Sequence, residues 1–315
     1  MIEFKHYTVM KKEAVDALNV KDGLVYVDAT LGGGGHSEEI LKKNPNGKLI
    51  SFDIDKEAIE ASTERLKCYD NLIIVNDSYT NIKKVLQNLG IEKITGGVII
   101  DLGASYHQLT SFDRGFSFLH DAPLDMRFGD NIELTAADIV NEYREDDLVR
   151  IFSEYGEERF SKRIAKAIVE RRKTKKIETT LDLANLIVES TPHIKSKIHP
   201  ATRVFQALRI EVNQELKNIE MFFNDVLELL DDGAIISAIS FHSLEDRIVK
   251  RFFKYHSQKC HCEKNQIICS CPPPKLELVN KKPVTATEEE IKLNPSSRSA
   301  KLRIARKINS KNEKI

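Results

Sequence analysis

Short apolar segments alternate with longer amphipathic segments over about the first hundred residues of the chain. The apolar segments are rich in β-branched residues and have the length of buried strands; they lie at 25–28, 49–53, 72–75 and 97–103. The segments between them carry apolar residues at helical spacing, at about 36–41, 56–67 and 82–89. This order of strand and helix predicts an α/β fold with a doubly wound, mostly parallel sheet.

The alternation stops near residue 111 and resumes near residue 234. A loop rich in Gly, Phe and acidic residues then precedes a mainly helical block, with helices expected at 135–142, 145–153, 157–173, 179–190 and 200–224. After this block come strands expected at 234–240, 276–280 and 302–307, the last two as an antiparallel hairpin. We therefore predict a helical domain, 111–214, inserted between a first core segment, 1–110, and a second core segment, 215–315.

The turn after the first predicted strand is the richest in glycine. It reads DATLGGGGHS over residues 28–37 and leads directly into a helical pattern. Glycines let a backbone approach a ligand closely, and a helix N-terminus offers unpaired N–H groups and partial positive charge. Asp53 ends the next strand about 20 residues later, where an acid can accept both hydroxyls of a ribose. A nucleotide-like cofactor fits this pattern, although an ordinary glycine-rich turn between strand and helix gives the same letters.

Two cofactor classes are compatible with this loop, the nicotinamide dinucleotides and S-adenosylmethionine. The dinucleotide fingerprint requires a third Gly or Ala, and Ser37 stands at that position. Asp28, just before the loop, is suited to a cationic ligand, and S-adenosylmethionine carries a sulfonium and an amino group. The residues therefore favour S-adenosylmethionine. Asp77 and Tyr79 follow the third strand and are compatible with adenine contacts, or equally with a turn acid and a core aromatic.

Charge is balanced overall, so composition alone does not indicate a nucleic-acid partner. The 315 residues include 48 Lys and Arg and 48 Asp and Glu. Locally, however, residues 159–176 hold nine Lys or Arg, and a second basic cluster lies at 298–314. Such a helix can bind a phosphate backbone, with Arg171, Arg172 and Lys173 as candidate contacts. The alternative is a charged helix face that is only exposed to solvent. No segment has the length of a membrane span, and we expect a cytoplasmic protein with no membrane partner.

Four of the five cysteines are gathered near the C-terminal end of the chain. They form two C-x-C pairs, Cys260 with Cys262 and Cys269 with Cys271. Four thiolates can bind zinc, but C-x-C is tighter than the usual C-x₂-C spacing. Reduced thiols without a ligand are equally compatible, so the sequence predicts no metal.

Seven strings distributed over nearly the whole chain resemble, in order, a bacterial family that methylates N4 of a cytosine in 16S ribosomal RNA. They are DATLGGGGHS, DLGASYHQL, RGFSF, PLDMRF, FQALRIEVNQEL, SFHSLEDRIVK and NPSSRSAKLR. The resemblance implies a class I S-adenosylmethionine-dependent methyltransferase core, a Rossmann-like sheet interrupted by a helical domain. It implies a substrate cytosine in the decoding region of the small ribosomal subunit. It also implies cofactor contacts at Gly34, Gly35, His36, Asp53, Tyr79, Asp101 and Gln108.

A target-base pocket is expected where the fourth and fifth core strands end side by side. Ser105 follows the fourth strand, and His242 follows the fifth. Asp125 and Arg127 lie in the loop between. We take Asp125 and His242 as candidate catalytic residues, and Ser105 and Arg127 as candidate substrate contacts. A structural Asp125–Arg127 ion pair and a helix-capping His242 are the alternatives.

Two other functions remain compatible with the sequence. One is a ribosome-assembly factor that keeps the fold and uses cofactor binding only as a structural element. The other is a nicotinamide-dependent reductase, which Ser37 disfavours.

Overall fold

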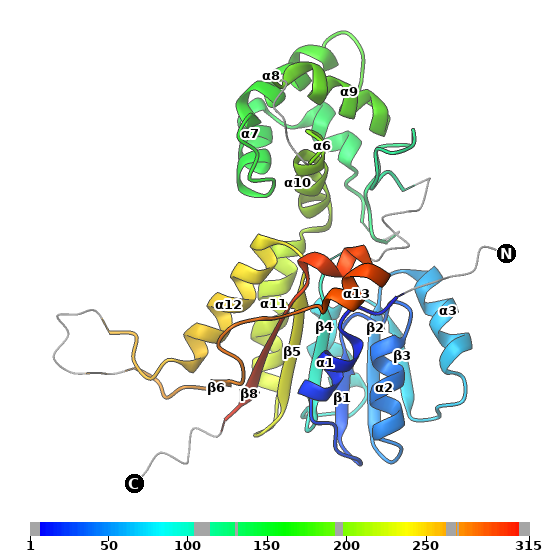
Figure 1. Cartoon of the computed structure of the whole chain (residues 1–315), viewed down its shortest axis with the longest axis vertical. Helices are drawn as coiled ribbons and strands as arrows, with labels where there is room; N and C mark the ends of the chain where they lie inside the picture. The colour runs from blue at the N-terminus through cyan, green and yellow to red at the C-terminus, as the bar shows by residue number, and fades with distance from the viewer. Residues whose placement is uncertain are drawn as a thin grey trace. The chain divides into compact units, whose positions relative to one another are not determined.

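The computed structural model describes residues 7–103, 114–129, 132–192, 198–262, 269 and 271–308. The chain divides into two compact units (Figure 1). The first joins Met1–Gly103 to Leu216–Ile315, and the second is Ala104–Glu215.

The first unit is built on a mixed sheet with the strand order β3-β2-β1-β4-β5-β8-β6, in which β7 pairs with β8. The strands are β1 (Val25–Asp28), β2 (Lys48–Asp53), β3 (Leu72–Asn76), β4 (Gly97–Asp101), β5 (Ile235–Ser240), β6 (Leu276–Leu278), β7 (Val284–Thr285) and β8 (Lys301–Lys307). The pairs among β1 to β5 are parallel, whereas β8 runs antiparallel to β5, β6 and β7. This topology is that of class I methyltransferases and confirms the predicted fold class.

Helices cover both faces of the sheet because alternate strand residues are apolar on both sides. In β4, Val98 and Ile100 belong to the core under α4, α11 and α12, while Ile99 belongs to the core under α1, α2 and α3. The helical elements of this unit are α1 (Lys11–Ala17), α2 (Gly35–Lys43), α3 (Lys56–Leu66), η1 (Tyr79–Asn81), α4 (Ile82–Asn88), α11 (Glu215–Leu229), α12 (Ser243–Ser257), α13 (Glu288–Leu293) and η2 (Pro295–Ser299). Among the described residues, no helix is both long and apolar enough to cross a bilayer.

The second unit has its own hydrophobic core, made by helices and by the loop before them. The helices are α6 (Ala136–Glu142), α7 (Glu145–Glu154), α8 (Ser161–Arg172), α9 (Thr180–Ser190) and α10 (Thr202–Asn213). Phe116, Leu124 and Met126 of the preceding loop are buried in the same core. The loop that the sequence showed as rich in Gly, Phe and acids is therefore packed against the helices it precedes.

Two helix predictions are wrong in their limits, and at each error a residue other than glycine has left-handed backbone. The helix expected at 200–224 is two helices, because Gln214 has a φ of 49° and ends α10. The helix expected at 157–173 begins only at Ser161, since Glu157 has a φ of 48°. Left-handed backbone at a residue other than glycine leaves no clear signature in a single sequence.

Candidate functional site

The candidate site residues of the first unit follow consecutive strands along one edge of the sheet. Asp53 ends β2, the glycine loop follows β1, and Asp101 ends β4. Asp101 is paired in register with Ile239 of β5, so His242 follows at the same edge. In parallel sheets, ligands bind at the carboxyl ends of the strands. The expected neighbourhood of the fourth and fifth core strands is thus confirmed.

The glycine loop needs its glycines for the fold itself. Gly34 is the N-cap of α2 with a φ of 74°, a conformation that residues with a side chain rarely adopt. A Cβ at Gly35 would lie 1.9 Å from Oγ1 of Thr8. The first backbone N–H groups of α2 come directly after Gly34. They carry the partial positive charge of a helix N-terminus, which favours an anionic group.

Asp28 and Ser37 form a buried pair inside this strand–turn–helix unit. Asp28 is fully buried; its Oδ2 accepts a 2.7 Å hydrogen bond from the Ser37 hydroxyl, and its Oδ1 accepts one of 3.1 Å from the Thr30 N–H. Burial raises the pKa of Asp28 to about 7. Burial and these hydrogen bonds use the Asp28 carboxyl group within the fold, and its contact with a cationic ligand stays a prediction. Ser37, which departs from the dinucleotide fingerprint, donates its hydroxyl hydrogen bond to this carboxyl group.

Asp53 links the glycine loop to the neighbouring strand. Its Oδ2 accepts a 2.8 Å hydrogen bond from the Gly32 N–H, and its Oδ1 accepts one of 2.9 Å from the Asp55 N–H. Burial raises the pKa of Asp53. The backbone N–H of Ile54 also hydrogen-bonds to this carboxyl group. A carboxylate has about four acceptor positions, so some acceptor capacity remains for a ribose hydroxyl.

Asp101 carries an unpartnered polar atom at this edge. Within the described residues, its Oδ1 is buried without a hydrogen-bond partner, while its backbone N–H donates to Oγ1 of Thr30 at 2.7 Å. Burial, followed by the charges of Asp28, Glu245 and Glu290, raises the pKa of Asp101 well above its ordinary value. A buried acceptor without a partner costs about 1–3 kcal/mol. A cationic or hydrogen-bond-donating ligand would relieve this cost, so Asp101 fits S-adenosylmethionine or an amino group.

The remaining cofactor candidates have structural contacts of their own. The His36 ring is buried, with Nε2 3.1 Å from the carbonyl oxygen of Val9. The half-buried Tyr79 ring packs edge-on against Phe222, with ring centroids 5.2 Å apart. Gln108 and Ser105 lie outside the described residues.

Asp77 behaves as the alternative interpretation expected. Its Oδ1 accepts hydrogen bonds from the Ser78 N–H at 2.7 Å and from Nδ2 of Asn81 at 2.8 Å. Asp77 is therefore a turn acid in this structure, and these contacts give no support to a contact between Asp77 and adenine.

His242 is the N-cap of α12, as the second interpretation of this residue predicted. Its ring accepts from the Glu245 N–H, and Oε2 of Glu245 accepts from the N–H groups of Phe241 and His242 at 2.8 and 3.2 Å. This reciprocal arrangement is a capping box. The fully buried Glu245 was missed as a site residue, although an acid three positions after a cap is a recognisable signal. The capping role is confirmed, and the catalytic role stays a prediction.

Asp125 and Arg127 form a bidentate ion pair within the second unit. Nε and Nη2 of Arg127 donate to the two carboxylate oxygens of Asp125 at 2.8 and 2.7 Å. Nη1 of Arg127 donates to the carbonyl oxygen of Ile132 at 3.0 Å. Although burial opposes it, the hydrogen bonds of Arg127 lower the pKa of Asp125. The ion-pair interpretation is confirmed, and an acid with a lowered pKa is a weak base.

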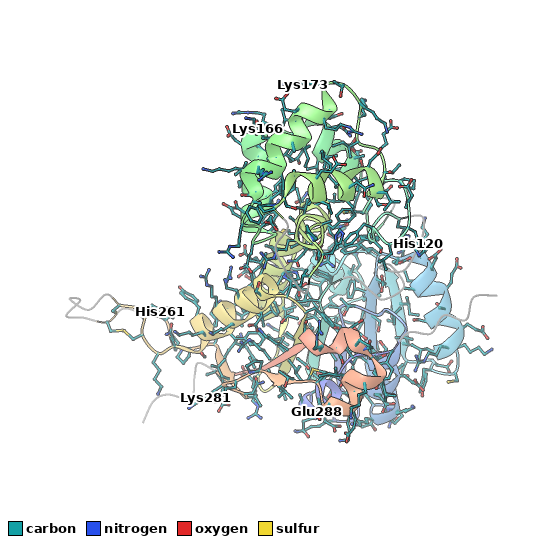
Figure 2. The ribbon with its side chains drawn as sticks, turned by 45° about the horizontal axis from the view of Figure 1, so that its top comes forward. His120, Lys166, Lys173, His261, Lys281 and Glu288 are labelled. Atoms are coloured by element: carbon teal, nitrogen blue, oxygen red, sulfur yellow. The ribbon has the colours of Figure 1, made fainter. Side chains whose placement is uncertain are left out.

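The basic helix α8 separates its charged residues from its apolar residues. Ile164, Ala165 and Ile168 are buried, while Lys162, Arg163, Lys166, Arg171 and Lys173 are exposed. Figure 2 labels Lys166 on this helix and Lys173 directly after its end. Arg172 differs from its neighbours because its Nη1 donates to the carbonyl oxygen of Val140 at 2.9 Å. Of the three predicted phosphate contacts, only Arg171 and Lys173 are therefore exposed.

Comparison with known proteins shows which family the chain belongs to. The model of the MraW methylase family matches residues 3–308. The chain belongs to the MraW methylase family. It is an enzyme, a methyltransferase, and S-adenosylmethionine is its methyl donor.

Two relatives cover the chain almost from end to end, and both are named ribosomal RNA small subunit methyltransferase H. The one from Clostridium botulinum (strain Loch Maree / Type A3) is 48% identical over 310 residues, 98% of this chain and 100% of the relative. The one from Caldicellulosiruptor bescii is 50% identical over 307 residues, 97% of this chain and 100% of the relative.

Solved structures of methyltransferases are also similar. An rRNA methylase from Streptococcus thermophilus has a TM-score of 0.41 at 10% identity, covering 94% of this chain and 95% of that chain. A SAM-dependent O-methyltransferase from Thermotoga maritima has a TM-score of 0.42 at 7% identity, covering 97% of this chain and 68% of that chain.

Proposed function

We propose that this enzyme transfers the methyl group of S-adenosylmethionine to the exocyclic N4 of a cytosine in the decoding region of 16S ribosomal RNA. The polymer class is supported by the relatives, which are named as small-subunit ribosomal RNA methyltransferases and match over the whole chain. The amino-directed chemistry is supported by Asp101, whose buried Oδ1 lacks a partner among the described residues. A ribosomal RNA substrate supports a cytoplasmic location, with the small subunit as the proposed partner.

On the cofactor side, each residue has a role that follows from its position. Asp53 keeps acceptor capacity for the ribose while it holds Gly32 in place. Gly34, Gly35 and His36 form the start of α2, where the first backbone N–H groups of a helix have no carbonyl partner within the helix. Asp101, Tyr79 and Gln108 complete the proposed cofactor contacts. When bound, S-adenosylmethionine supplies an electrophilic methyl group on a sulfonium cation.

On the substrate side, Asp101 is also the proposed acceptor for the N4 amino group, in addition to its proposed contact with the cofactor. The lone pair of that amine is delocalised into the cytosine ring, so it is a poor nucleophile. An acceptor that holds its N–H groups favours the geometry needed for in-line attack. His242 is the proposed catalytic residue at the end of the neighbouring strand. Ser105, which lies outside the described residues, remains a proposed substrate contact. Arg127 and Asp125 remain candidates from the inserted unit.

The inserted unit supplies the proposed contacts to the phosphate backbone. The exposed cations of α8 lie along one side of a helix whose other side is buried. A row of cations on a rigid helix can follow successive phosphates. Arg171 and Lys173 are the proposed contacts from the predicted set, and Arg172 instead supports them by holding α8 to Val140.

The decisive experiment uses small subunits from cells that lack this enzyme. The protein and isotope-labelled S-adenosylmethionine are added, and the 16S RNA is digested to nucleosides for mass spectrometry. We expect labelled N4-methylcytidine at one site, and none with an Asp101→Ala variant that retains its fold. Label on carbon or on ribose oxygen contradicts amino methylation. Binding to the subunit without any label supports an assembly factor instead.

A further inference from the structure

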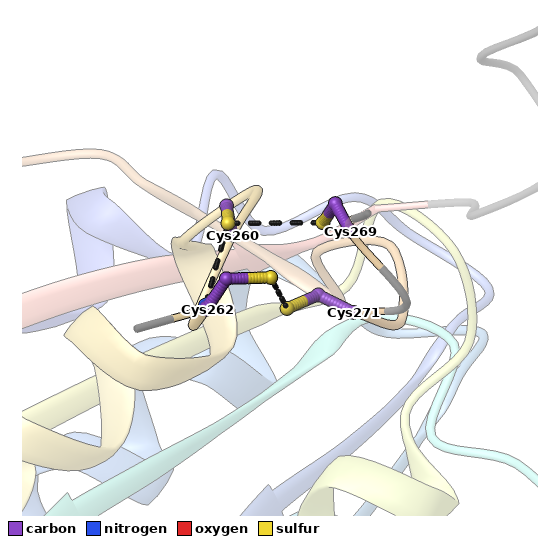
Figure 3. A group of neighbouring side chains, drawn as sticks. All are labelled: Cys260, Cys262, Cys269 and Cys271. Carbon is purple, nitrogen blue, oxygen red and sulfur yellow. Dashed lines mark hydrogen bonds between the residues drawn. The ribbon is translucent and has the colours of Figure 1, made fainter. Parts of the chain in front are cut away.

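Four cysteines converge between the end of α12 and the start of β6. Cys260 and Cys262 come from the chain leaving α12, and Cys269 and Cys271 come from the chain approaching β6. Their four Sγ atoms all lie within 4.8 Å of one another (Figure 3). The two C-x-C pairs, which the sequence left without an assigned role, therefore make one cluster.

The spacing of the sulfur atoms matches that of ligands around a single ion. Zn–S bonds of about 2.3 Å in a tetrahedron place the sulfurs about 3.8 Å apart. Sγ of Cys260 and Sγ of Cys269 are 3.7 Å apart, and Sγ of Cys262 and Sγ of Cys271 are 3.4 Å apart. A disulfide would require about 2.05 Å. All four cysteines are free.

Backbone N–H groups point at two of these sulfurs. The His261 N–H donates to Sγ of Cys271 at 3.0 Å, which joins one C-x-C pair to the other. The Cys262 N–H donates to Sγ of Cys260 at 3.4 Å. Donors of this kind stabilise thiolates and orient them as metal ligands.

Hydrophobic burial does not account for the gathering of these side chains. Cys260 and Cys269 are exposed, and Cys262 and Cys271 are only half-buried. Free cysteines without a ligand are usually among the most buried residues. The loop is nevertheless attached to α12, because the His261 ring stacks on the Tyr255 ring with centroids 4.2 Å apart. The Lys275 N–H also donates to the carbonyl oxygen of His256 at 2.8 Å.

We propose that Cys260, Cys262, Cys269 and Cys271 bind one Zn²⁺ ion in a structural site that closes the loop between α12 and β6. Four thiolates complete a tetrahedral coordination sphere and leave no open position for a water molecule or substrate. The site is therefore separate in function from the methyl-transfer site. Its contribution is to hold the two C-x-C pairs together.

The test measures metal in the full-length protein, purified under reducing conditions without a chelator. We expect about one zinc per chain by inductively coupled plasma mass spectrometry. A Cys260→Ser/Cys271→Ser variant should retain roughly a tenth of that or less. Cys68→Ser is the matched control, because Cys68 is an exposed free cysteine outside the cluster, and it should keep full zinc. Cobalt in place of zinc should give the intense visible bands of tetrahedral thiolate coordination.

Each of the following results would overturn the proposal. One is absence of zinc together with no thiolate–cobalt spectrum; another is equal zinc in the double variant and the wild type. A further one is iron at full occupancy, and the last is intramolecular disulfides in protein alkylated at lysis. If the double variant does not fold, a Cys269→His variant is tested instead. It should retain zinc, and its cobalt spectrum should shift to shorter wavelength. An unshifted spectrum would exclude Cys269 as a ligand.

Discussion

The Gly32 N–H donates a 2.8 Å hydrogen bond to Oδ2 of Asp53 and so ties the glycine loop after β1 to the end of β2. One carboxylate thereby has two tasks, shaping the loop and offering acceptors to a ribose. Any substitution of Asp53 affects both, and its consequences must be measured on the free protein as well as on cofactor binding.

We expect Asp53→Ala to weaken S-adenosylmethionine binding by at least about tenfold, because a charged acceptor for the ribose is worth roughly 1.5–3 kcal/mol. Calorimetric titration measures the dissociation constant, and thermal unfolding measures the separate effect of losing the Gly32 hydrogen bond. Asp70→Ala removes an exposed acid of the same unit and should leave both unchanged. An unaltered dissociation constant in Asp53→Ala would mean that the ribose is held elsewhere.

Cofactor binding should depend on pH through Asp101. Its pKa is raised by burial and by the nearby charges of Asp28, Glu245 and Glu290. A sulfonium cation beside Asp101 favours the ionised carboxylate, so binding releases a proton and affinity increases as pH rises toward the pKa of the free protein. S-adenosylhomocysteine lacks the sulfonium charge and should show a smaller dependence.

Titrations from about pH 6 to pH 9, in buffers of different ionisation enthalpy, count the released protons. Asp101→Asn cannot ionise at this position and should reduce the difference between the two ligands. Equal pH dependence of the two ligands in the wild type would remove Asp101 from the vicinity of the sulfonium.

Substituting the exposed cations of α8 should weaken binding to the small subunit without affecting the cofactor. In Arg171→Ala/Lys173→Ala, the slope of log affinity against log salt should fall by about 0.7–0.9 for each phosphate that is no longer neutralised. Arg172 is left intact because it holds α8 to Val140. Lys281→Ala/Lys282→Ala removes two exposed charges from the other unit as a control. An unchanged slope would identify α8 as a solvated face.

His242 requires a pair of variants, because its capping role is structural. His242→Ala removes the cap and the ring, whereas His242→Asn keeps a good capping side chain and removes only the ring. We expect both to lower single-turnover methyl transfer by roughly 10²-fold with little change in cofactor affinity, as when a catalytic group is removed. Recovery of the rate in His242→Asn would assign His242 to the helix cap alone.

The strands and most of the helices could be predicted from the sequence because they depend on local periodicity. Val98, Ile99 and Ile100 form an uninterrupted apolar run, which is typical of a strand buried on both faces. The glycine loop could also be recognised from the sequence. Its glycines are needed because Gly34 has a positive φ and a Cβ at Gly35 would clash with Thr8. The family resemblance likewise depended on short contiguous sequence motifs, such as the glycine loop.

The partners of polar side chains were decided only by the tertiary structure, because they join residues far apart in the sequence. Asp28 was expected to face a ligand, and only the structure shows that its carboxyl group is buried and bonded to Ser37. Arg172 was expected to contact phosphate, but it reaches Val140 on another helix. The sequence contained the charge of each residue, whereas burial and hydrogen bonding, which determine what a charge can do, arise from packing.

The two C-x-C pairs illustrate the same division. Their spacing along the chain was compatible with a metal site and with free thiols. The separation between Cys262 and Cys271 is a property of the folded loop, in which α12 and β6 set where the two ends of the chain meet. The sequence therefore determined the ligand chemistry available, and only the fold decided that four sulfurs lie close enough to share one ion.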